Sequence, residues 1–417
     1  MEYYYTINDE TDAVKSSMNP SNQDNTNAPG VIVTAGISPN TLGVVRCFGR
    51  RGIPVVYIDS EPHSIARYSR YIHRRLACKS TDHPERQLVS ILIELGRTVN
   101  DKMVIVPTGD KDVLSLSRYR KELAEFYHVP VGSFETVHDL VNKKRFYRLL
   151  AEKGIPHPGT YFPEHPDELL SVGREMPYPY ILKPADSLSF YKAFGMKNFL
   201  IRSVDDLEQA ALKLRGKNLD MIVQEIIPGR EIYMFYTYFS RNSEPLGLCG
   251  YDKIRQYMPD FGFGSFCRSM WRPDAAETPL QLLREIGYHG FAEPELKRDP
   301  RDGQYKLLEI NARTTLQNRL PAACGVDIEY IAYLDCLGRK PEAAITTPPD
   351  GVLWIDDFAD QASFLMHLKR RDMDTSEIML SLKLGKVHSV AAWDDPLPFI
   401  VRGAKSSMVG LKRLFKK

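Results

Sequence analysis

The first part of the chain alternates short apolar runs with an amphipathic segment. The runs are rich in β-branched residues and cover residues 31–34, 54–58 and 103–106. Between the first two runs, apolar residues recur at helical spacing, at Leu42, Val45 and Phe48. A strand, a helix and a second strand in close succession form a βαβ unit, which requires a parallel sheet. We therefore expect an α/β domain over residues 30–137.

The turn after the first run lacks the glycine pattern of dinucleotide-binding proteins. That pattern, G-x-G-x-x-G, lets the backbone approach a pyrophosphate, whereas this turn has glycine only at Gly36 and Gly43. A role for these two glycines in the turn and in packing is as good an explanation as a role in binding a ligand. We do not expect an enzyme that uses NAD.

The second part of the chain mixes helices and strands in a different order. Asn142 opens an amphipathic helix, and apolar strands are predicted at residues 177–184 and 221–227. The Ser-, Phe- and Lys-containing residues 186–198 are predicted as a loop. This order indicates an α+β module rather than a second doubly wound sheet.

A hairpin is predicted further along the chain. Apolar strands over residues 291–297 and 304–310 flank the turn sequence D-P-R-D-G. A register centred on that turn places Glu295 opposite Glu309. Like charges in such a pair repel by about 0.2 to 1 kcal/mol, so the two carboxylates need a compensating cation.

The hairpin carboxylates indicate a magnesium site. Together with the amide oxygen of Asn311, the carboxylates of Glu295 and Glu309 form an oxygen set that suits Mg²⁺, which takes further ligands from substrate phosphates. The alternative is that both glutamates face solvent, the usual place for this residue type. Apolar residues on both faces of the hairpin favour the metal site, and a nucleotide with it.

These motifs, in this order, resemble the ATP-grasp superfamily. The resemblance runs from about residue 31 to about residue 398 and includes an apolar-apolar-Lys-Pro strand, an E-x-x-x-G-x-E pattern and a closing E-x-N-x-R motif. The residues that carry it are Lys144, Lys183, residues 224–231, Glu295, Glu309, Asn311 and Arg313. It implies a multidomain α/β and α+β chain: an ATP-grasp fold with an N-terminal Rossmann-like parallel-sheet domain.

The resemblance implies a set of phosphate contacts. Lys144 and Lys183 would act as point charges on the ATP phosphates. The segment that should cover the triphosphate is poor in glycine, so Ser187, Ser189 and Lys197 would replace backbone donors. We expect these five residues to bind ATP, with Lys183 also catalytic.

Other residues are assigned to the nucleoside and the reacting groups in the same way. Gln224 would meet the adenine amino group, the backbone from Glu225 to Ile227 would contact the adenine edge, and Glu231 would bind the ribose. Arg313 would bind the substrate carboxylate or the developing acyl phosphate, work that suits a planar guanidinium.

The implied metal content is two Mg²⁺ ions, held by Glu295, Glu309 and Asn311. The ions would neutralise charge on the transferring phosphoryl group.

The implied reaction is ATP-dependent amide formation. Enzymes of this kind convert a carboxylate to an acyl phosphate, which an amine attacks to give an amide, ADP and phosphate. The pattern is most similar to carboxylate-amine ligases of the D-aspartate ligase kind, which suggests addition of an amino acid such as D-aspartate to a cell-envelope precursor. Arg67 and Asp110 are candidates for binding the small-molecule acid and amine, and a surface salt bridge explains either residue equally well.

Two alternatives share the same ATP residues. One is a ligase whose nucleophile is a thiol or a bicarbonate-type group instead of an amine. The other is a non-catalytic ATP sensor, which the retention of Glu295, Glu309 and Asn311 disfavours.

Composition and charge limit the classes of partner that this chain is expected to bind. The chain has 417 residues with 55 Lys and Arg against 53 Asp and Glu, a balance that predicts no nucleic-acid partner. No transmembrane segment is apparent, so a cytoplasmic enzyme is expected, and the possibility of an oligomer stays open. The six cysteines show no metal or disulfide spacing, which indicates reduced thiols.

The two ends of the chain differ from the rest. Residues 1–29 are polar and predict a disordered leader, whereas residues 341–417 form an appendage with a basic tail. The central ATP-grasp domain is expected over residues 138–340, with a lid-like part at about 178–232. Residues 401–417 combine basic and apolar positions, so contact with a membrane surface is an alternative to a solvated helix.

Overall fold

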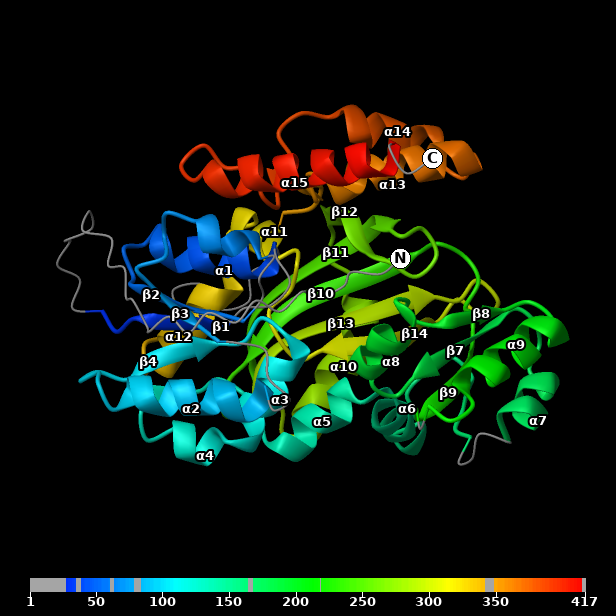
Figure 1. The fold of residues 1–417 in the computed structure, drawn as a ribbon, viewed down its shortest axis with the longest axis horizontal. Helices are drawn as coiled ribbons and strands as arrows, with labels where there is room; N and C mark the ends of the chain where they lie inside the picture. The colour runs from blue at the N-terminus through cyan, green and yellow to red at the C-terminus, as the bar shows by residue number, and fades with distance from the viewer. Residues whose placement is uncertain are drawn as a thin grey trace. The chain divides into compact units, whose positions relative to one another are not determined.

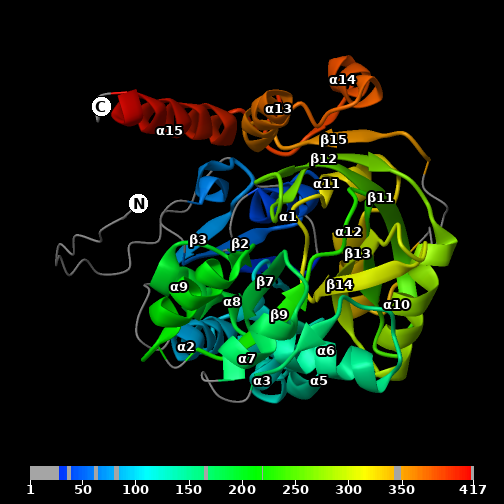
Figure 2. The same cartoon turned by 90° about the vertical axis from the view of Figure 1, so that its right-hand side faces the viewer.

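The computed structural model describes most of the chain. The described residues are 28–34, 39–60, 64–78, 84–163, 168–217, 219–341 and 349–414. They divide into two compact units (Figures 1 and 2), and unit 1 consists of His138–Arg230 and Leu296–Glu309. Unit 2 holds the described residues up to Val137, Glu231–Glu295 and those from Ile310 onward. The leader predicted over residues 1–29 lies almost wholly outside the described residues, and the predicted domain limits stay predictions.

Unit 2 begins with the expected parallel sheet. Its strand order is β3-β2-β1-β4-β5, and each neighbouring pair is parallel. The strands are β1 (Val31–Thr34), β2 (Val55–Asp59), β3 (Arg74–Ala77), β4 (Met103–Val106) and β5 (Tyr127–His128). The intervening helices are α1 (Asn40–Gly49), η1 (Ile65–Tyr68), α2 (Pro84–Gly96), α3 (Asp110–Arg118) and α4 (Arg120–Leu123). The predicted βαβ unit and its parallel sheet are confirmed.

A larger sheet follows, in the order β14-β13-β10-β11-β12-β15-β16. Its strands are β10 (Ile232–Phe239), β11 (Pro245–Tyr257), β12 (Phe263–Ser269), β13 (Gly290–Arg298), β14 (Tyr305–Asn311), β15 (Leu353–Ile355) and β16 (Val387–His388). The predicted hairpin is confirmed, because β13 and β14 are neighbours and Asp299 exchanges backbone hydrogen bonds with Gln304 and Gly303 in the turn. The register that faces Glu295 with Glu309 stays a prediction.

Unit 1 is built on a four-stranded antiparallel sheet in the order β6-β9-β7-β8. The strands are β6 (Thr160–Tyr161), β7 (Tyr180–Pro184), β8 (Phe199–Ile201) and β9 (Met221–Glu225). The helices that accompany it are α6 (Lys143–Glu152), α7 (Glu168–Glu175), α8 (Ser187–Phe194) and α9 (Val204–Leu214), while α5 (Phe134–Val141) leads into the unit. The Asn142 side chain accepts a hydrogen bond from the Arg145 amide and so caps α6 as predicted.

The loop predicted over residues 186–198 is wrong, because these residues contain helix α8. Phe190 and Phe194 are four positions apart, so they lie on one face of a helix. Both rings pack on Phe199 of β8, with centroids 5.1 Å from its ring. Burial of this aromatic cluster accounts for the helix.

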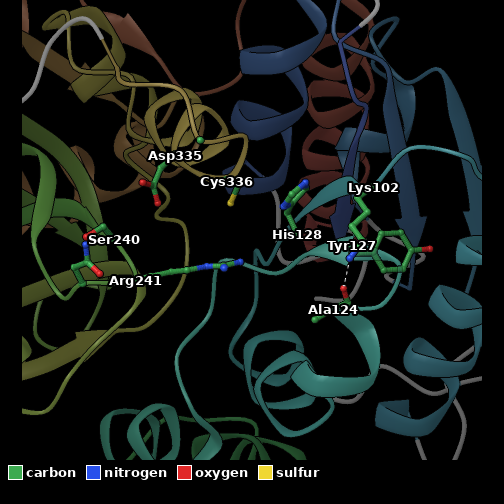
Figure 3. Close-up of a pocket in the computed structure, with 10 residues that line it drawn as sticks. Lys102, Ala124, Tyr127, His128, Ser240, Arg241, Asp335 and Cys336 are labelled. Atoms are coloured by element: carbon green, nitrogen blue, oxygen red, sulfur yellow. Dashed lines mark hydrogen bonds between the residues drawn. The ribbon is translucent and has the colours of Figure 1, made fainter.

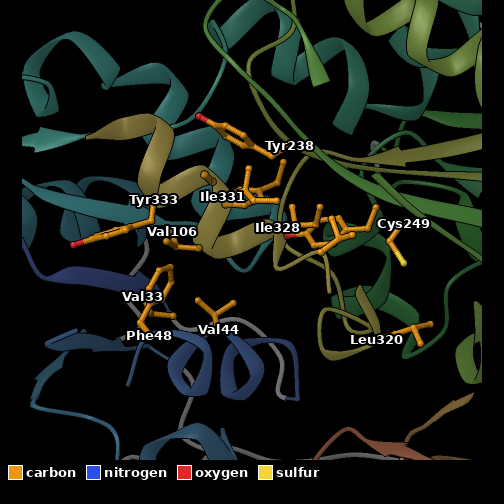
Figure 4. Packing of buried hydrophobic residues seen from close by; sticks show 14 of the residues in the cluster. Val33, Val44, Phe48, Val106, Tyr238, Cys249, Leu320, Ile328, Ile331 and Tyr333 are labelled. Carbon is orange, nitrogen blue, oxygen red and sulfur yellow. The ribbon is translucent and has the colours of Figure 1, made fainter. Parts of the chain in front are cut away.

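The main hydrophobic core of unit 2 joins the parallel sheet to a later helix (Figure 4). Val33 of β1 and Val106 of β4 belong to it, together with Phe48 of α1. Phe48 packs on Tyr333 of α12 (Ile328–Cys336), with ring centroids 5.6 Å apart. This core fixes the carboxyl ends of β1 and β4 within the unit.

The C-terminal part of unit 2 is helical. Its helices, besides α12, are α11 (Arg319–Ala323), α13 (Ala359–Arg370), α14 (Thr375–Leu382) and α15 (Leu397–Leu414). One further helix of unit 2, α10 (Pro273–Glu285), lies earlier in the chain, between β12 and β13. Within the described residues, no helix combines the length and the apolar character needed to span a membrane. All six cysteines are free thiols, as predicted.

Candidate active site

A fully buried carboxylate, Glu293, organises the site in unit 2. Glu293 lies on β13 and accepts hydrogen bonds from the hydroxyls of Tyr251 and Thr315. The amide nitrogen of Asn311 donates to its other oxygen at 3.2 Å. Burial raises the pKa of Glu293 to about 6. The sequence analysis did not assign this residue a role.

Arg313 extends this network toward the surface. One guanidinium nitrogen donates to the Asn311 amide oxygen at 3.1 Å, and Nε donates to the Asp110 carboxylate at 2.8 Å. The amide of Asn311 is therefore held at both ends, by Arg313 and Glu293. The structure brings together two residues predicted independently, Arg313 and Asp110.

Asp110 occupies a favourable place for a ligand-binding group. It begins α3, the first helix after β4, and its side chain is half exposed. The parallel sheet reverses its strand order between β1 and β4. In open α/β sheets, ligands bind beyond the carboxyl ends of the strands at such a reversal.

Glu295 is paired with a lysine that the sequence analysis missed. Lys253 of β11 donates to Glu295 at 2.8 Å, and its side chain is almost completely buried. A buried lysine beside one carboxylate is a strong local charge that would attract phosphate oxygens as well. A lysine within a strand of buried residues is the signal that could have identified it.

The donor atoms of Glu295 and Asn311 suit Mg²⁺ in kind, since both are hard oxygens. Each of these side chains is already held by a cationic neighbour, Lys253 or Arg313. Across the described ranges, no group of three or more His, Cys, Asp or Glu residues is placed to hold a metal by itself. The arrangement therefore fits a metal that takes part of its ligands from a substrate.

Glu309, the third predicted magnesium ligand, belongs to unit 1. The ammonium of Lys143 lies 3.7 Å from its carboxylate. The neighbouring Lys144, which the sequence analysis assigned to ATP, donates to Asp220 at 3.0 Å. Lys143 is thus a second lysine at the start of α6, and the sequence analysis, which chose Lys144, did not assign it a role.

Lys183 lies on β7 beside an aromatic ring. Its ammonium is 5.7 Å from the ring centroid of Tyr147, whose hydroxyl donates to the Leu308 carbonyl at 2.5 Å. Gln224 is buried, and its amide nitrogen donates to Thr160 at 2.8 Å. Because Gln224 is engaged inside unit 1, an adenine contact would require this hydrogen bond to be shared or exchanged.

The rest of the predicted nucleotide set is distributed as follows. Glu225 accepts hydrogen bonds from the Gly159 amide at 2.9 Å and from Arg301 at 3.2 Å, and Ile227 is buried. Exposed positions are occupied by Lys197, between α8 and β8, and by Glu231, before β10. Ser187 and Ser189 lie in α8, but their side chains fall outside the described residues.

Arg67, the other predicted substrate residue, forms an ion pair. Two of its guanidinium nitrogens lie 2.5 and 3.1 Å from the Asp59 carboxylate at the end of β2. This geometry agrees with the salt-bridge alternative. Substrate binding by Arg67 stays a prediction.

A pocket of about 500 Å³ lies elsewhere in unit 2 (Figure 3). Lys102, His128, Arg241 and Asp335 line it, and Arg241 extends into its centre. Burial and the nearby charges of Lys102 and Arg241 lower the pKa of His128. None of the predicted site residues lines this pocket, so the candidate site rests on its side-chain chemistry.

Comparisons with known proteins indicate the family of this chain. The chain is 30% identical to D-aspartate ligase of Enterococcus faecium over 329 residues, which cover 74% of the chain and 77% of that protein. No protein-family model matches it.

Solved structures share the fold. One is carboxyaminoimidazole ribonucleotide synthase from Aspergillus clavatus with ATP, with a TM-score of 0.60, 18% identity and coverage of 81% of this chain and 86% of that one. Another is the biotin carboxylase domain of the Hydrogenobacter thermophilus 2-oxoglutarate carboxylase with MgADP and bicarbonate. Its TM-score is 0.59 at 16% identity, over 79% of this chain and 74% of that one.

Proposed function

We propose that this chain, which belongs to the D-aspartate ligase family of ATP-grasp ligases, joins a carboxylic acid to an amine through an acyl phosphate. The observation that carries the proposal is the hydrogen-bonded row from Asp110 through Arg313 and Asn311 to Glu293. It holds an arginine suited to a carboxylate or acyl phosphate next to a predicted magnesium ligand.

The proposed reaction has two steps. In the first, a carboxylate oxygen of the acid attacks the γ-phosphorus of ATP, and the bond from that phosphorus to ADP breaks. In the second, the amine nitrogen attacks the acyl carbon, phosphate leaves with the electrons of its carbon–oxygen bond, and the nitrogen loses a proton. The guanidinium of Arg313 would stabilise the charge that develops on the acyl oxygens.

The chain would hold Mg²⁺ through Glu295, Glu309 and Asn311, with two ions proposed. When bound, the metal would neutralise charge on the phosphates. Lys253 donates a hydrogen bond to Glu295 and would orient that carboxylate.

The phosphates of the nucleotide would meet lysines of unit 1. Lys144 and Lys183 remain the proposed phosphate contacts, and Lys143 joins them because of its pairing with Glu309. Gln224 to Ile227 would contact adenine, and Glu231 would bind the ribose.

For the substrates, we propose an amino acid such as D-aspartate and an acceptor of the cell-envelope precursor class, with the reaction in the cytoplasm. The support is the family relative named above, which is a D-aspartate ligase. Asp110 would orient the amino group of one substrate, because a half-exposed carboxylate attracts an ammonium ion.

The proposal is tested by measuring ADP release from Mg-ATP with a panel of acids, each with and without amines, and with D-aspartate in both roles. Release that needs both an acid and an amine, and that disappears in Asn311→Ala, supports it. Release supported by a thiol or bicarbonate without any amine would replace it with the alternative nucleophile. ATP binding with no release across the panel would contradict turnover with this class of substrates.

A further inference from the structure

One buried amide links the start of helix α1 to the segment that carries Arg313. The side chain of Asn40 donates from Nδ2 to the Thr314 carbonyl at 2.9 Å and to the Thr108 carbonyl at 3.0 Å. Asn40 is only 4% exposed, and the two acceptors lie 274 and 68 positions away in the chain. Since Thr314 directly follows Arg313, Asn40 holds the backbone beside the arginine that is proposed to act on the acyl oxygens.

The Thr314 carbonyl is also a contact of the Arg313 guanidinium. A terminal nitrogen of Arg313 donates to this carbonyl at 3.1 Å, so one oxygen accepts from both Asn40 and Arg313. A carbonyl oxygen has two lone pairs and can accept both hydrogen bonds. The guanidinium also donates to Asp110 and Asn311. Of these three acceptors, the Thr314 carbonyl is the one that Asn40 fixes.

The partners of Asn40 determine the orientation of its amide. Backbone carbonyls can only accept, so the amide nitrogen must face Thr108 and Thr314. The amide oxygen accepts from the side-chain nitrogen of Asn318 at 3.2 Å, and the same nitrogen donates to the Asn40 backbone carbonyl at 3.0 Å. The Asn40 side chain is therefore held at both ends.

Gly43 makes room for this arrangement. A Cβ atom at Gly43 would lie 2.0 Å from the side-chain oxygen of Asn318, much closer than two such atoms can approach. The missing side chain at Gly43 therefore lets Asn318 reach Asn40. The packing role of this glycine supports the Asn40 contact.

Helix α1 itself does not use the Asn40 side chain. Asparagine often caps a helix, but here Pro39 occupies the cap position and the cap has no side-chain hydrogen bond. The amide of Asn40 instead joins two distant segments of unit 2. These hydrogen bonds therefore serve the contact between the segments and not the start of the helix.

We propose that Asn40 is a positioning residue for Arg313: it fixes the Thr314 carbonyl, and that carbonyl aims the guanidinium. The inference rests on the role proposed above for Arg313. Asn40 acts through the backbone of Thr314 and is assigned no contact with a substrate. A shift of about 1 Å in a group that orients the reaction can lower the rate about 100-fold, so a contact one step away can affect turnover.

The first test needs no turnover and uses Asn40→Ala in the full chain. Phenylglyoxal modifies arginine side chains, and peptide mass spectrometry gives the rate at each arginine. Loss of the hydrogen bond should release the Thr314 carbonyl, so Arg313, whose side chain is 22% exposed, should react about fivefold faster. Buried Arg46 lies on the same helix as Asn40 and should stay unreactive, which separates local release from a general loosening of α1.

The second test measures ADP release with the acid and amine that support it. We expect kcat to fall about tenfold in Asn40→Ala, with the KM for ATP nearly unchanged. Because Asn40 acts through Arg313, the double variant Asn40→Ala/Arg313→Lys should have the same kcat as Arg313→Lys alone. Independent effects of the two changes would multiply.

The matched control is Thr41→Val, which removes a buried hydrogen bond of 2.9 Å to the Thr108 hydroxyl and leaves the contact with Thr314 intact. It should change neither the labelling rate of Arg313 nor kcat. If circular dichroism shows that Asn40→Ala is unfolded, Asn318→Ala takes its place, since it removes the donor that holds the Asn40 amide oxygen. It should change both readouts in the same direction by smaller factors.

Three results would overturn the proposal: an unchanged labelling rate of Arg313, labelling of Arg46 that rises together with that of Arg313, or effects on kcat that multiply in the double variant. Absence of ADP release with every acid and amine would instead refute the proposed function. The labelling rates would then still decide whether Asn40 positions Arg313.

Discussion

Two sets of ion pairs in unit 2 use the same residue types for different purposes. Arg46 is completely buried, and it donates to the Asp395 carboxylate at 2.9 Å and to the Val390 and Asp395 carbonyls. In the candidate site, Arg313 also meets a carboxylate, but Asp110 on the other side is half exposed. The buried Arg46–Asp395 pair is surrounded by protein atoms, whereas the Arg313–Asp110 pair is open to solvent on the Asp110 side.

The two ion pairs allow effects on stability to be separated from effects on the reaction. The buried pair joins the C-terminal segment to α1, since Arg46 and Asp395 come from distant parts of the chain. Breaking this buried pair should lower the stability of the protein without a specific effect on the reaction. Changing the Arg313–Asp110 pair should lower activity and leave the stability of the protein nearly unchanged.

The largest expected effect is on stability, in Asp395→Ala. Removing this carboxylate leaves the buried guanidinium of Arg46 uncompensated and takes a partner from the Ser69 hydroxyl. We expect a loss of about 3 to 5 kcal/mol in the free energy of unfolding, measured by urea denaturation.

The neighbouring Asp394 is the matched control. It pairs with Arg50 at 2.7 Å where both side chains are partly exposed. Asp394→Ala should cost about 0 to 1 kcal/mol. Equal losses in the two variants would contradict the distinction between buried and open pairs.

The next effect is on turnover, in Arg313→Lys. Lysine keeps the charge but loses the planar fork that reaches both Asp110 and Asn311. We expect kcat for ADP release to fall about 100-fold, with an unfolding free energy within about 1 kcal/mol of the original. Arg370→Lys, which alters an exposed pair with Asp260, is the control and should keep full activity.

A third test concerns the pH dependence of stability through Glu293. Burial raises the pKa of Glu293 to about 6, above the value of about 4.3 for an unfolded chain. The folded chain therefore binds this proton more tightly, and the free energy of unfolding falls as the pH rises between those values. In the original protein, Glu293 should lower the free energy of unfolding by about 2 kcal/mol as the pH rises from about 4.3 to about 6. In Glu293→Gln this decrease should be absent, as measured by urea unfolding at several pH values in that range. Parallel stability curves for the two proteins would show that Glu293 does not titrate in this way.

The smallest expected effect is on substrate affinity, in Asp110→Asn. The change removes the charge that would orient an ammonium ion, and the exposed side chain contributes little to stability. We expect the KM for one substrate to rise about tenfold with kcat nearly unchanged. A loss confined to kcat would move Asp110 from substrate binding to catalysis.

The elements of the fold were largely predictable from the sequence. Residues 31–34 and 103–106 match β1 and β4 residue for residue, because short β-branched runs between turn residues have few other solutions. Helix α8 was missed because its helical character comes from packing of Phe190 and Phe194 on Phe199. That contact is made with a later strand, which local pattern does not reveal.

The site was predictable only in part. Arg313 and Asp110 were both singled out, but their pairing spans 203 positions of the chain and needed the fold. Lys253 and Glu293 were missed for the same reason, since each acts through a partner on another strand of the large sheet. Lys144 was chosen from its position at the helix start, and the pairing of the adjacent Lys143 with Glu309 was not visible in the sequence.

The central claim is that the acid is activated as an acyl phosphate. The most direct test uses the acid and amine that support ADP release, with the acid labelled with ¹⁸O in its carboxylate, and follows the label by mass spectrometry of the released phosphate. The account predicts that each phosphate carries one ¹⁸O atom from the acid, because that oxygen bridges the acyl carbon and the phosphorus. Unlabelled phosphate at full turnover would contradict it.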